Sequence, residues 1–244
     1  MSRKNQRNDY DPTFFKGIAH RGLHGEGISE NSLLSFQKAI EAKSAFELDV
    51  HLSKDGELIV CHDSELKRVT GKQGIIEELT LQQIKEYKLL DGQTIPTFQE
   101  VLALNHEQSL IVTELKVYNK NYKALRRKVM EELSCIKDDK KIVLISFDPR
   151  ALIGIGKRFK RQLLVCKESS WTLHLRHLFD SLDLECCLSK TKKVMNYRKK
   201  GGIVNIWTVE NEKQAEEFAP FVDTITYQYI KPDFIKDLLS KKQR

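Results

Sequence analysis

The sequence lacks any long hydrophobic run. No stretch approaches the roughly 18–20 consecutive apolar residues that a membrane-spanning helix requires. The first residues, Met1 to Asp11, are polar and charged, and they lack the apolar segment and small-residue cleavage site of a secretory signal. We therefore expect a soluble, cytoplasmic protein.

Cysteine is scarce and shows no metal or redox spacing. The five cysteines are odd in number and form no Cys-x-x-Cys pair, which argues against a zinc site, a redox dithiol or a disulfide framework. They are Cys61, Cys135, Cys166, Cys186 and Cys187. Because their surroundings are apolar, we expect reduced, buried thiols.

Nucleic-acid motifs are also missing, although the chain carries a net charge of +7. The basic clusters at Lys157 to Arg161 and Lys190 to Lys200 contain no interleaved aromatic platform, so we expect no nucleic-acid partner. The positive surplus could attract a small anionic substrate or give weak peripheral contact with an anionic membrane. Such a surplus is also typical of an ordinary solvated surface. The sequence does not indicate an oligomeric state.

What the sequence does contain is a regular alternation of short apolar runs and amphipathic stretches, which is typical of parallel strands with crossover helices. The expected strands are Gly17–His20, Phe46–Leu52, Leu110–Leu115, Lys141–Ser146, Gln162–Cys166, Asp183–Leu188, Ile203–Trp207 and Asp223–Thr226. Eight strands in 244 residues favour one α/β domain over residues 1–244, a (β/α)8 barrel. An open doubly wound sheet would produce a similar pattern.

Helical periodicity supports the crossovers, and one irregular segment interrupts them. Leu33, Phe36 and Ile40 share one helical face, as do Leu125, Val129 and Leu133. The segment of about 53–104, between the second and third barrel strands, is punctuated by glycines and Pro96. We interpret it as a small insertion over the barrel mouth.

The second expected strand carries the strongest chemical signal. Strand alternation places Glu47, Asp49 and His51 on one face, with the intervening apolar residues on the other. Asp55-Gly56 is a two-residue hairpin signal. If those two residues form the turn, Lys54 pairs with Glu57 and Asp49 faces His62. A histidine would then lie beside two carboxylates.

The neighbouring strands should add charged groups at the same place. In a right-handed barrel the first and third strands flank the second, which brings His20-Arg21 and Glu114-Leu115-Lys116 beside Glu47 and Asp49. Three acidic side chains without cysteine suit one hard divalent cation, Mg²⁺ or Ca²⁺. The alternative interpretation is a hydrated strand whose acids form structural ion pairs with Arg21 and Lys116.

These segments together form an ordered motif. It comprises Ile18-Ala19-His20-Arg21-Gly22, Ser29-Glu30-Asn31-Ser32, Glu47-Leu48-Asp49-Val50, Asp55-Gly56, His62-Asp63, Glu114-Leu115-Lys116, Ser146-Phe147 and Ile206-Trp207-Thr208-Val209. It resembles the signature of the glycerophosphodiester phosphodiesterase family over about residues 17–230. Ser29 and Ser32 depart from the usual proline and threonine, and Tyr227-Gln228 departs from the usual end of the last strand, which bears on substrate choice.

The resemblance implies a TIM barrel with a small insertion after its second strand, and it implies roles for particular residues. Glu47, Asp49 and Glu114 would hold the metal, and His20 and His62 would act as acid and base. Arg21 and Lys116 would bind the phosphate. Phe147 and Trp207 would contact the alcohol part of the substrate, unless they are ordinary barrel-core aromatics.

The implied reaction is metal-dependent hydrolysis of a glycerophosphodiester to glycerol 3-phosphate and an alcohol. The attacking oxygen is either water or the neighbouring hydroxyl of the glycerol. Two other functions stay open at this point: a lysophospholipase D-like or cyclising lyase activity on lipids, and a non-catalytic barrel that binds phosphodiesters.

Overall fold

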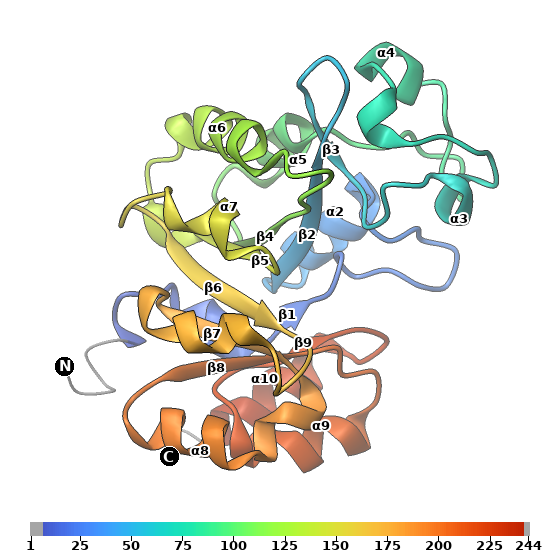
Figure 1. Cartoon of the computed structure of the whole chain (residues 1–244). Helices are drawn as coiled ribbons and strands as arrows, with labels where there is room; N and C mark the ends of the chain where they lie inside the picture. The colour runs from blue at the N-terminus through green and yellow to red at the C-terminus, as the bar shows by residue number, and fades with distance from the viewer. Residues whose placement is uncertain (1–6, 242–244) are drawn as a thin grey trace.

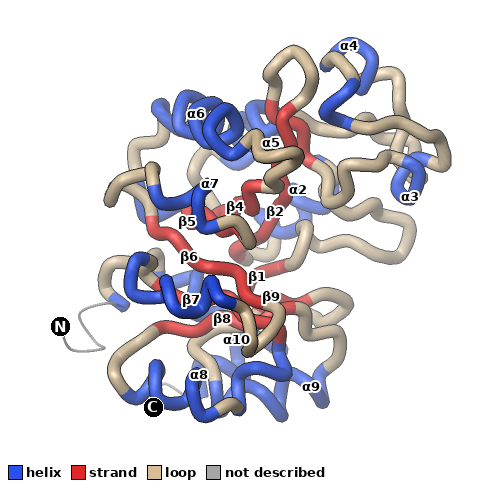
Figure 2. The backbone as a smooth tube through the Cα atoms, in the orientation of Figure 1, coloured by secondary structure: helices blue, strands red, loops and turns tan. Residues whose placement is uncertain are grey.

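The computed structural model describes residues 7–241, which form a barrel of eight parallel strands (Figures 1 and 2). The strands are β1 (Ile18–Ala19), β2 (Ala45–Leu52), β4 (Ile111–Leu115), β5 (Ile142–Ser146), β6 (Lys160–Val165), β7 (Ser181–Glu185), β8 (Ile203–Trp207) and β9 (Thr226–Tyr227). Neighbouring strands pair in the order β8-β7-β6-β5-β4-β2-β1-β9. A parallel bridge between Val209 and Tyr227 joins the two ends. The expected (β/α)8 architecture is confirmed, and the open sheet is excluded.

A layer of helices surrounds these strands, one in each crossover and one after the last strand. The helices are α2 (Leu33–Glu41), α5 (Phe98–Asn105), α6 (Tyr122–Glu132), α7 (Pro149–Ile153), α8 (Lys192–Lys199), α9 (Glu212–Phe218) and α10 (Pro232–Lys241), with a 3-10 helix, η5 (Trp171–Leu178), between β6 and β7. The predicted apolar faces are the packed faces, since Phe36, Leu125 and Val129 are fully buried. Phe36 of α2 packs on Phe46 of β2 with ring centroids 4.9 Å apart.

Two of the predicted strands were misplaced. The sixth expected strand, Asp183–Leu188, is β7, which runs from Ser181 to Glu185 and not to Leu188, because Cys186–Lys190 form a 3-10 turn. Leu188 is nevertheless buried from that turn, so its apolar character reflects packing and not strand structure. The last strand begins at Thr226. Before it the backbone pairing with β8 is irregular, because the N–H groups of Asp223 and Thr224 both donate to the Val204 carbonyl oxygen and the Val204 N–H donates to the Asp223 carboxylate.

Strand alternation divides the barrel into an outer and an inner core. Phe46, Leu48 and Val50 of β2 point outward into the main core with the helices, as predicted. On the opposite face Ala45 joins a second apolar cluster inside the barrel. Further along that inner face, toward the carboxyl end of β2, come the acidic residues. The barrel interior is therefore apolar at one end and polar at the other.

The apolar end of the barrel is closed by the N-terminal segment. The 3-10 helix η1 (Pro12–Lys16) begins at Asp11, whose side chain accepts a hydrogen bond from the Thr13 backbone N–H. Tyr10, Phe14 and Phe15 stack edge to face or tilted, with centroids 4.7–5.8 Å apart. All three are buried in the inner cluster. The functional chemistry is consequently confined to the other end.

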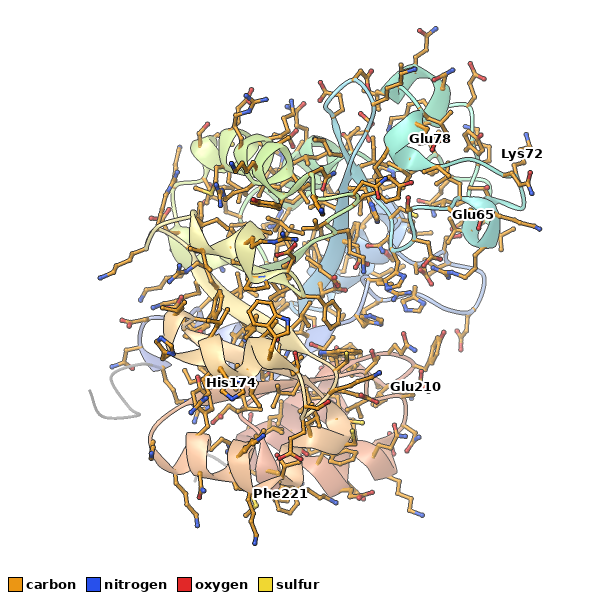
Figure 3. All side chains as sticks on the ribbon, viewed as in Figure 1. Glu65, Lys72, Glu78, His174, Glu210 and Phe221 are labelled. Atoms are coloured by element: carbon orange, nitrogen blue, oxygen red, sulfur yellow. The ribbon has the colours of Figure 1, made fainter. Side chains whose placement is uncertain are left out.

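The insertion after β2 lies to one side of that open end (Figure 1). It contains β3 (Leu58–Val60), α3 (Lys67–Thr70), η2 (Ile76–Glu78) and α4 (Leu81–Ile84). In Figure 3, Glu65, Lys72 and Glu78 mark its outer surface. It has its own small apolar cluster, whereas Phe98 and Val101 of α5 belong to the main core. We therefore place the end of the insertion just before α5, some residues earlier than the sequence indicated.

The hairpin that starts the insertion differs from its predicted register by one residue. Val50 pairs with Val60 and Leu52 with Leu58, so Asp49 lies opposite Cys61 and not His62. The reason is a loop of three residues, Lys54 to Gly56, in place of a two-residue turn. Gly56 has φ = 88°, the left-handed conformation that such loops require of their last residue.

The thiol prediction was wrong for most of the cysteines. All five are free, but only Cys61 is buried; Cys135, Cys166 and Cys187 are exposed and Cys186 is intermediate. The four that are not buried lie at or just past the ends of strands and 3-10 turns, where local apolar neighbours do not ensure burial.

No helix within residues 7–241 is long and apolar enough to cross a membrane.

We expect Phe14→Ala to lower the free energy of unfolding by about 3–5 kcal/mol, because it leaves a cavity among fully packed rings. Leu90→Ala, at a side chain that is 75% exposed, should change stability by less than about 0.5 kcal/mol. Denaturant unfolding monitored by circular dichroism measures both. Similar effects of the two substitutions would contradict the proposed role of Tyr10, Phe14 and Phe15 in closing this end of the barrel.

Candidate active site

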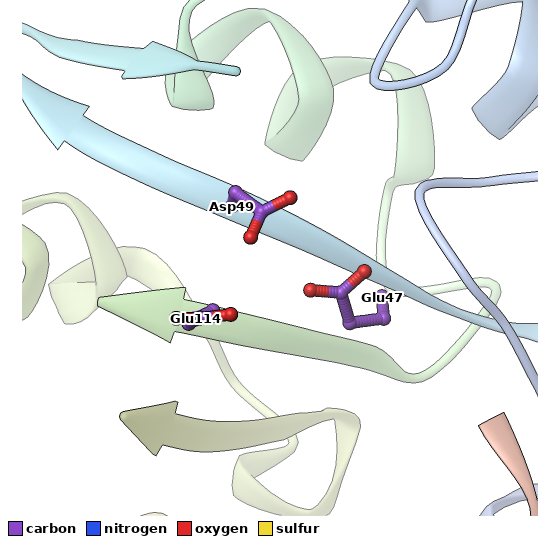
Figure 4. Close-up of side chains that lie close together, drawn as sticks. All are labelled: Glu47, Asp49 and Glu114. Carbon is purple, nitrogen blue, oxygen red and sulfur yellow. The ribbon is translucent and has the colours of Figure 1, made fainter. Parts of the chain in front are cut away.

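Three carboxylates meet at the open end of the barrel (Figure 4). Glu47 and Asp49, two positions apart on β2, both point toward the inside of the barrel. Glu114 of β4 is the register partner of Asp49. One oxygen from each of the three side chains lies within 4.8 Å of the others, and all three residues are buried. Such an all-oxygen set of ligands fits a hard divalent cation.

Two cations lie against this acidic trio. The Lys116 Nζ is 3.3 Å from Asp49 Oδ1 and 3.1 Å from Glu114 Oε1. The Arg21 Nε lies 3.6 Å from Asp49 Oδ2, and the Arg21 backbone N–H donates to Glu47 Oε2 at 3.0 Å. The cations neutralise part of the buried negative charge, and the three acids together still exceed them by one.

The imbalance appears in the pKa values of the acids. Burial and the neighbouring carboxylates raise the pKa of Glu47 well above its ordinary value. Burial also raises the pKa of Glu114 to about 7, against the effect of Lys116. Burial alone would raise the pKa of Asp49, but Lys116 and Arg21 outweigh it and hold that pKa below its usual range. The trio therefore resists full ionisation without a further positive charge.

His20 follows β1 directly and faces the trio from one side. Its Nδ1 lies 2.8 Å from the Gln228 Oε1, and the Gln228 amide nitrogen donates in turn to Glu210 Oε1 at 2.7 Å. The carbonyl oxygen of Gln228 can only accept, so Nδ1 carries the proton and Nε2 is left for a ligand. Burial, and then the charge of Arg21, lower the pKa of His20 to about 4.

His62 follows β3 and is anchored in the same way. Its Nδ1 lies 2.7 Å from Asp63 Oδ1, while the other Asp63 oxygen accepts from Arg68. Arg68 and Arg21 both donate to Glu30, at 2.7–2.9 Å. Burial lowers the pKa of His62 as well. Near neutral pH both rings are therefore mainly uncharged, and their Nε2 atoms are available to accept a proton.

These groups line one small cavity that opens toward a larger groove. A cavity of about 90 Å³ is lined by His20, Arg21, Glu47, His62, Glu114, Phe147 and Trp207, among others. The Phe147 and Trp207 rings pack edge to face with centroids 5.6 Å apart. A groove of about 810 Å³ continues from it, sharing Glu114 and Phe147 and including Lys116. The site residues predicted from sequence thus come together.

Comparison with known protein families identifies the family of this chain. The model of the glycerophosphoryl diester phosphodiesterase family matches residues 20–230. The chain belongs to this family. A glycerophosphodiester phosphodiesterase of Caldanaerobacter subterraneus subsp. tengcongensis is 30% identical over 149 residues, which cover 57% of this chain and 61% of the relative. The matched segment thus spans about three fifths of that relative's length.

Solved structures of the family agree with the fold over nearly the whole chain. A glycerophosphodiester phosphodiesterase of Parabacteroides distasonis superposes with a TM-score of 0.79 at 27% identity, covering 93% of this chain and 97% of the other. A phosphodiesterase of Oleispira antarctica, solved in complex with the product sn-glycerol-3-phosphate, gives a TM-score of 0.80 at 25% identity, covering 93% and 96%.

Several polar residues of this family member support the site although sequence reasoning assigned them no role. Asn31 is buried and its amide donates to Asp49 Oδ2 at 2.9 Å, and Glu30 joins Arg21 to Arg68. Both lie in the Ser29–Ser32 motif, which could have signalled them. Gln228 had been noted only as a departure from the family pattern, yet it anchors His20.

Asp183 of β7 is a further acid of the site that sequence reasoning missed. It lines the cavity and is 2% exposed, and one of its oxygens has no hydrogen-bond partner within the described residues. Burial raises its pKa to about 8. At neutral pH the carboxyl group is therefore mainly protonated and can donate a hydrogen bond.

His51 shares the inner face of β2 with the acids, as alternation predicted, but lies outside the trio. Its ring contacts Glu77 of the insertion and the backbone of His62, and it borders the groove and not the small cavity.

The anchor of His20 makes a prediction about its pKa. The double substitution E210Q/Q228E exchanges amide and carboxylate, so that a negative charge faces the His20 Nδ1. A carboxylate at this distance favours the imidazolium, so the pKa of His20 should rise by about 1–3 units. NMR titration of the imidazole C–H resonances measures it. Glu210→Gln alone is the control, and an unchanged pKa in the double variant would contradict the assigned contact.

Proposed function

We propose that this protein hydrolyses glycerophosphodiesters to glycerol 3-phosphate and a free alcohol. In this proposal Glu47, Asp49 and Glu114 hold one divalent cation, Mg²⁺ or Ca²⁺, and His20 and His62 are the acid–base pair. The observation that carries the proposal is the shared cavity: two imidazoles with anchored Nδ1 atoms border the same small space as Glu47 and Glu114, two members of the buried carboxylate trio.

The charged residues would bind and orient the phosphodiester. When bound, the cation supplies Lewis-acid stabilisation of the negative charge on the phosphate. Arg21 and Lys116 lie beside the trio, where their side chains can contact phosphate oxygens while still neutralising the acids. Their ion pairs with Glu30, Asp49 and Glu114 hold them in place before substrate arrives, which reduces the entropy lost on binding.

The two histidines would move the protons. One Nε2 accepts the proton of the attacking oxygen, from water or from the neighbouring glycerol hydroxyl. The other ring enters the step as the imidazolium and gives its Nε2 proton to the leaving alkoxide. Gln228 and Asp63 differ in charge, so the two rings are not equivalent. Burial lowers the pKa of both rings, but the Asp63 carboxylate opposes that shift at His62, whereas the pKa of His20 falls to about 4. This difference favours His20 as the base and His62 as the acid.

The shape of the site indicates where each half of the substrate lies. The cavity of about 90 Å³ suits the small glycerol phosphate, and Phe147 and Trp207 line its wall, where their rings can contact the alcohol part of the substrate. The open groove of about 810 Å³ would receive the alcohol. Since an open groove excludes few groups, we expect several head-group alcohols to be accepted.

The same groove supports a second candidate, a lysophospholipase D-like or cyclising activity on lipids. Phe147 is 41% exposed and Trp171 is 65% exposed, and both line the groove. Exposed aromatic side chains of this kind suit an acyl chain. Release of a stable cyclic phosphate from a lysophospholipid, detected by phosphorus NMR, would select this candidate.

Removal of either histidine should stop turnover without unfolding the barrel. His20→Ala and His62→Ala should each lower kcat by at least about 10²-fold, the usual scale of an acid–base contribution. Release of glycerol 3-phosphate from a panel of glycerophosphodiesters measures the rate, and thermal melting checks the fold. His106→Ala, at a residue that caps α5 away from the site, is the control. Near-normal activity of either site variant would refute its assignment.

Cation binding should be chelator-sensitive and pH-dependent. Excess Mg²⁺ or Ca²⁺ at about 100 times Kd should stabilise the protein, previously freed of metal by a chelator, by about 2.7 kcal/mol, and Glu47→Gln should greatly weaken this effect.

Because the pKa of Glu114 is about 7, a proton must leave before the cation binds at lower pH. The apparent Kd should therefore rise as the pH falls from about 8 to about 6. Calorimetry measures it, and activity that survives chelation would contradict the metal role.

A further inference from the structure

His51 is a buried residue of β2 that the proposed reaction does not use. Its side chain is 5% exposed, and both ring nitrogens have partners. Nδ1 lies 2.6 Å from Glu77 Oε1, and Nε2 lies 3.1 Å from the backbone carbonyl oxygen of His62. Because a carbonyl oxygen can only accept, Nε2 donates to it.

Glu77 connects this ring to the rest of the insertion. It belongs to η2 (Ile76–Glu78), and its second carboxylate oxygen accepts a hydrogen bond from the Ser64 hydroxyl. Three segments are therefore joined through side chains: the barrel strand β2, the loop that carries His62 and Ser64, and η2.

The loop that carries His62 needs such support. Strand β3 ends at Val60, and residues 61–64 form no helix or strand. The backbone N–H of Cys61 donates to the backbone carbonyl oxygen of Asp49 at 3.1 Å. The backbone carbonyl oxygen of Ser64 accepts from the backbone N–H of Ile76 at 3.0 Å. Between these two points, the contact with His51 orients the peptide plane that follows His62.

The orientation of that peptide plane affects the direction of the His62 side chain. Its imidazole is already held at Nδ1 by Asp63, the next residue along the chain. A rotation of the peptide between the two residues would move both the ring and its anchor. Misplacement by about 1 Å can reduce a catalytic rate by about 10²-fold.

We propose that His51 is a positioning residue, which with Glu77 and Ser64 holds the backbone of His62 so that its imidazole faces the phosphate. The inference rests on the proposed acid–base role of His62. It also gives η2 a part in catalysis, because Glu77 belongs to that helix and not to the loop that carries His62.

The first test separates kcat from KM. His51→Leu should lower kcat by about 10–100-fold while KM for a glycerophosphodiester changes by less than about threefold, because the groups that bind phosphate are untouched. His51→Gln should recover most of kcat, since its amide N–H can still donate to the His62 oxygen. Equal losses in the two variants, or unchanged kcat in His51→Leu, would overturn the proposal.

The insertion side of the contact has a matched pair of variants. Glu77→Ala should lower kcat in the same sense as His51→Leu, whereas Glu78→Ala, at the adjacent exposed residue of η2 (Figure 3), should leave kcat unchanged. Glu77→Ala also tests the proposal if His51→Leu fails to fold. Wild-type kcat in a folded Glu77→Ala variant would count against it.

A double-mutant cycle distinguishes positioning from general structural support. If His51 acts through His62, His51→Leu should cause no more than about a twofold further loss of kcat in a His62→Ala background. A full multiplicative loss would mean that His51 acts elsewhere in the site, and the inference would fail. Wild-type activity of His62→Ala itself would instead refute the proposed function, so the two failures are distinguishable.

Discussion

Three carboxylates held together out of water are the constraint on which the site depends. Burial and mutual repulsion raise the pKa values of Glu47 and Glu114, so the arrangement is unfavourable unless positive charge lies nearby. Lys116 and Arg21 supply part of that charge. Each is within two residues of a motif acid or histidine along the chain, so the compensation is built into the same strand ends as the acids.

The barrel makes this concentration of charge tolerable by separating it from the structural core. The end of the barrel opposite the acids is filled by apolar side chains and closed by Tyr10, Phe14 and Phe15, while the outward faces of the strands pack on the helices. The inner face near the carboxyl ends is then free to carry polar groups. Asp183 extends that polar surface on the far side of the cavity.

The two histidines illustrate how a rigid barrel positions residues that lie beyond its strands. Neither ring belongs to a strand, and each is held at Nδ1 by an acceptor, Gln228 for His20 and Asp63 for His62. Gln228 directly follows the last strand, β9, and is 208 residues from His20 along the chain. The Asp63 anchor continues through Arg68 and Glu30 to Arg21, so His62 and the arginine proposed to bind phosphate share one network.

The sequence by itself determined the number and order of the barrel strands and most of the charged side chains that meet at the open end. Alternation along β2 placed Glu47 and Asp49 inward, and parallel pairing placed Glu114 beside them, because both rules are local and depend on a strand period of two. The sequence alone did not determine the hairpin register, the end of β7 or the exposure of the cysteines. A left-handed glycine, a 3-10 turn and distant packing set these features. The anchors Gln228 and Glu77 likewise depended on the tertiary structure, since closure of the barrel and folding of the insertion bring them to rings far away in the chain.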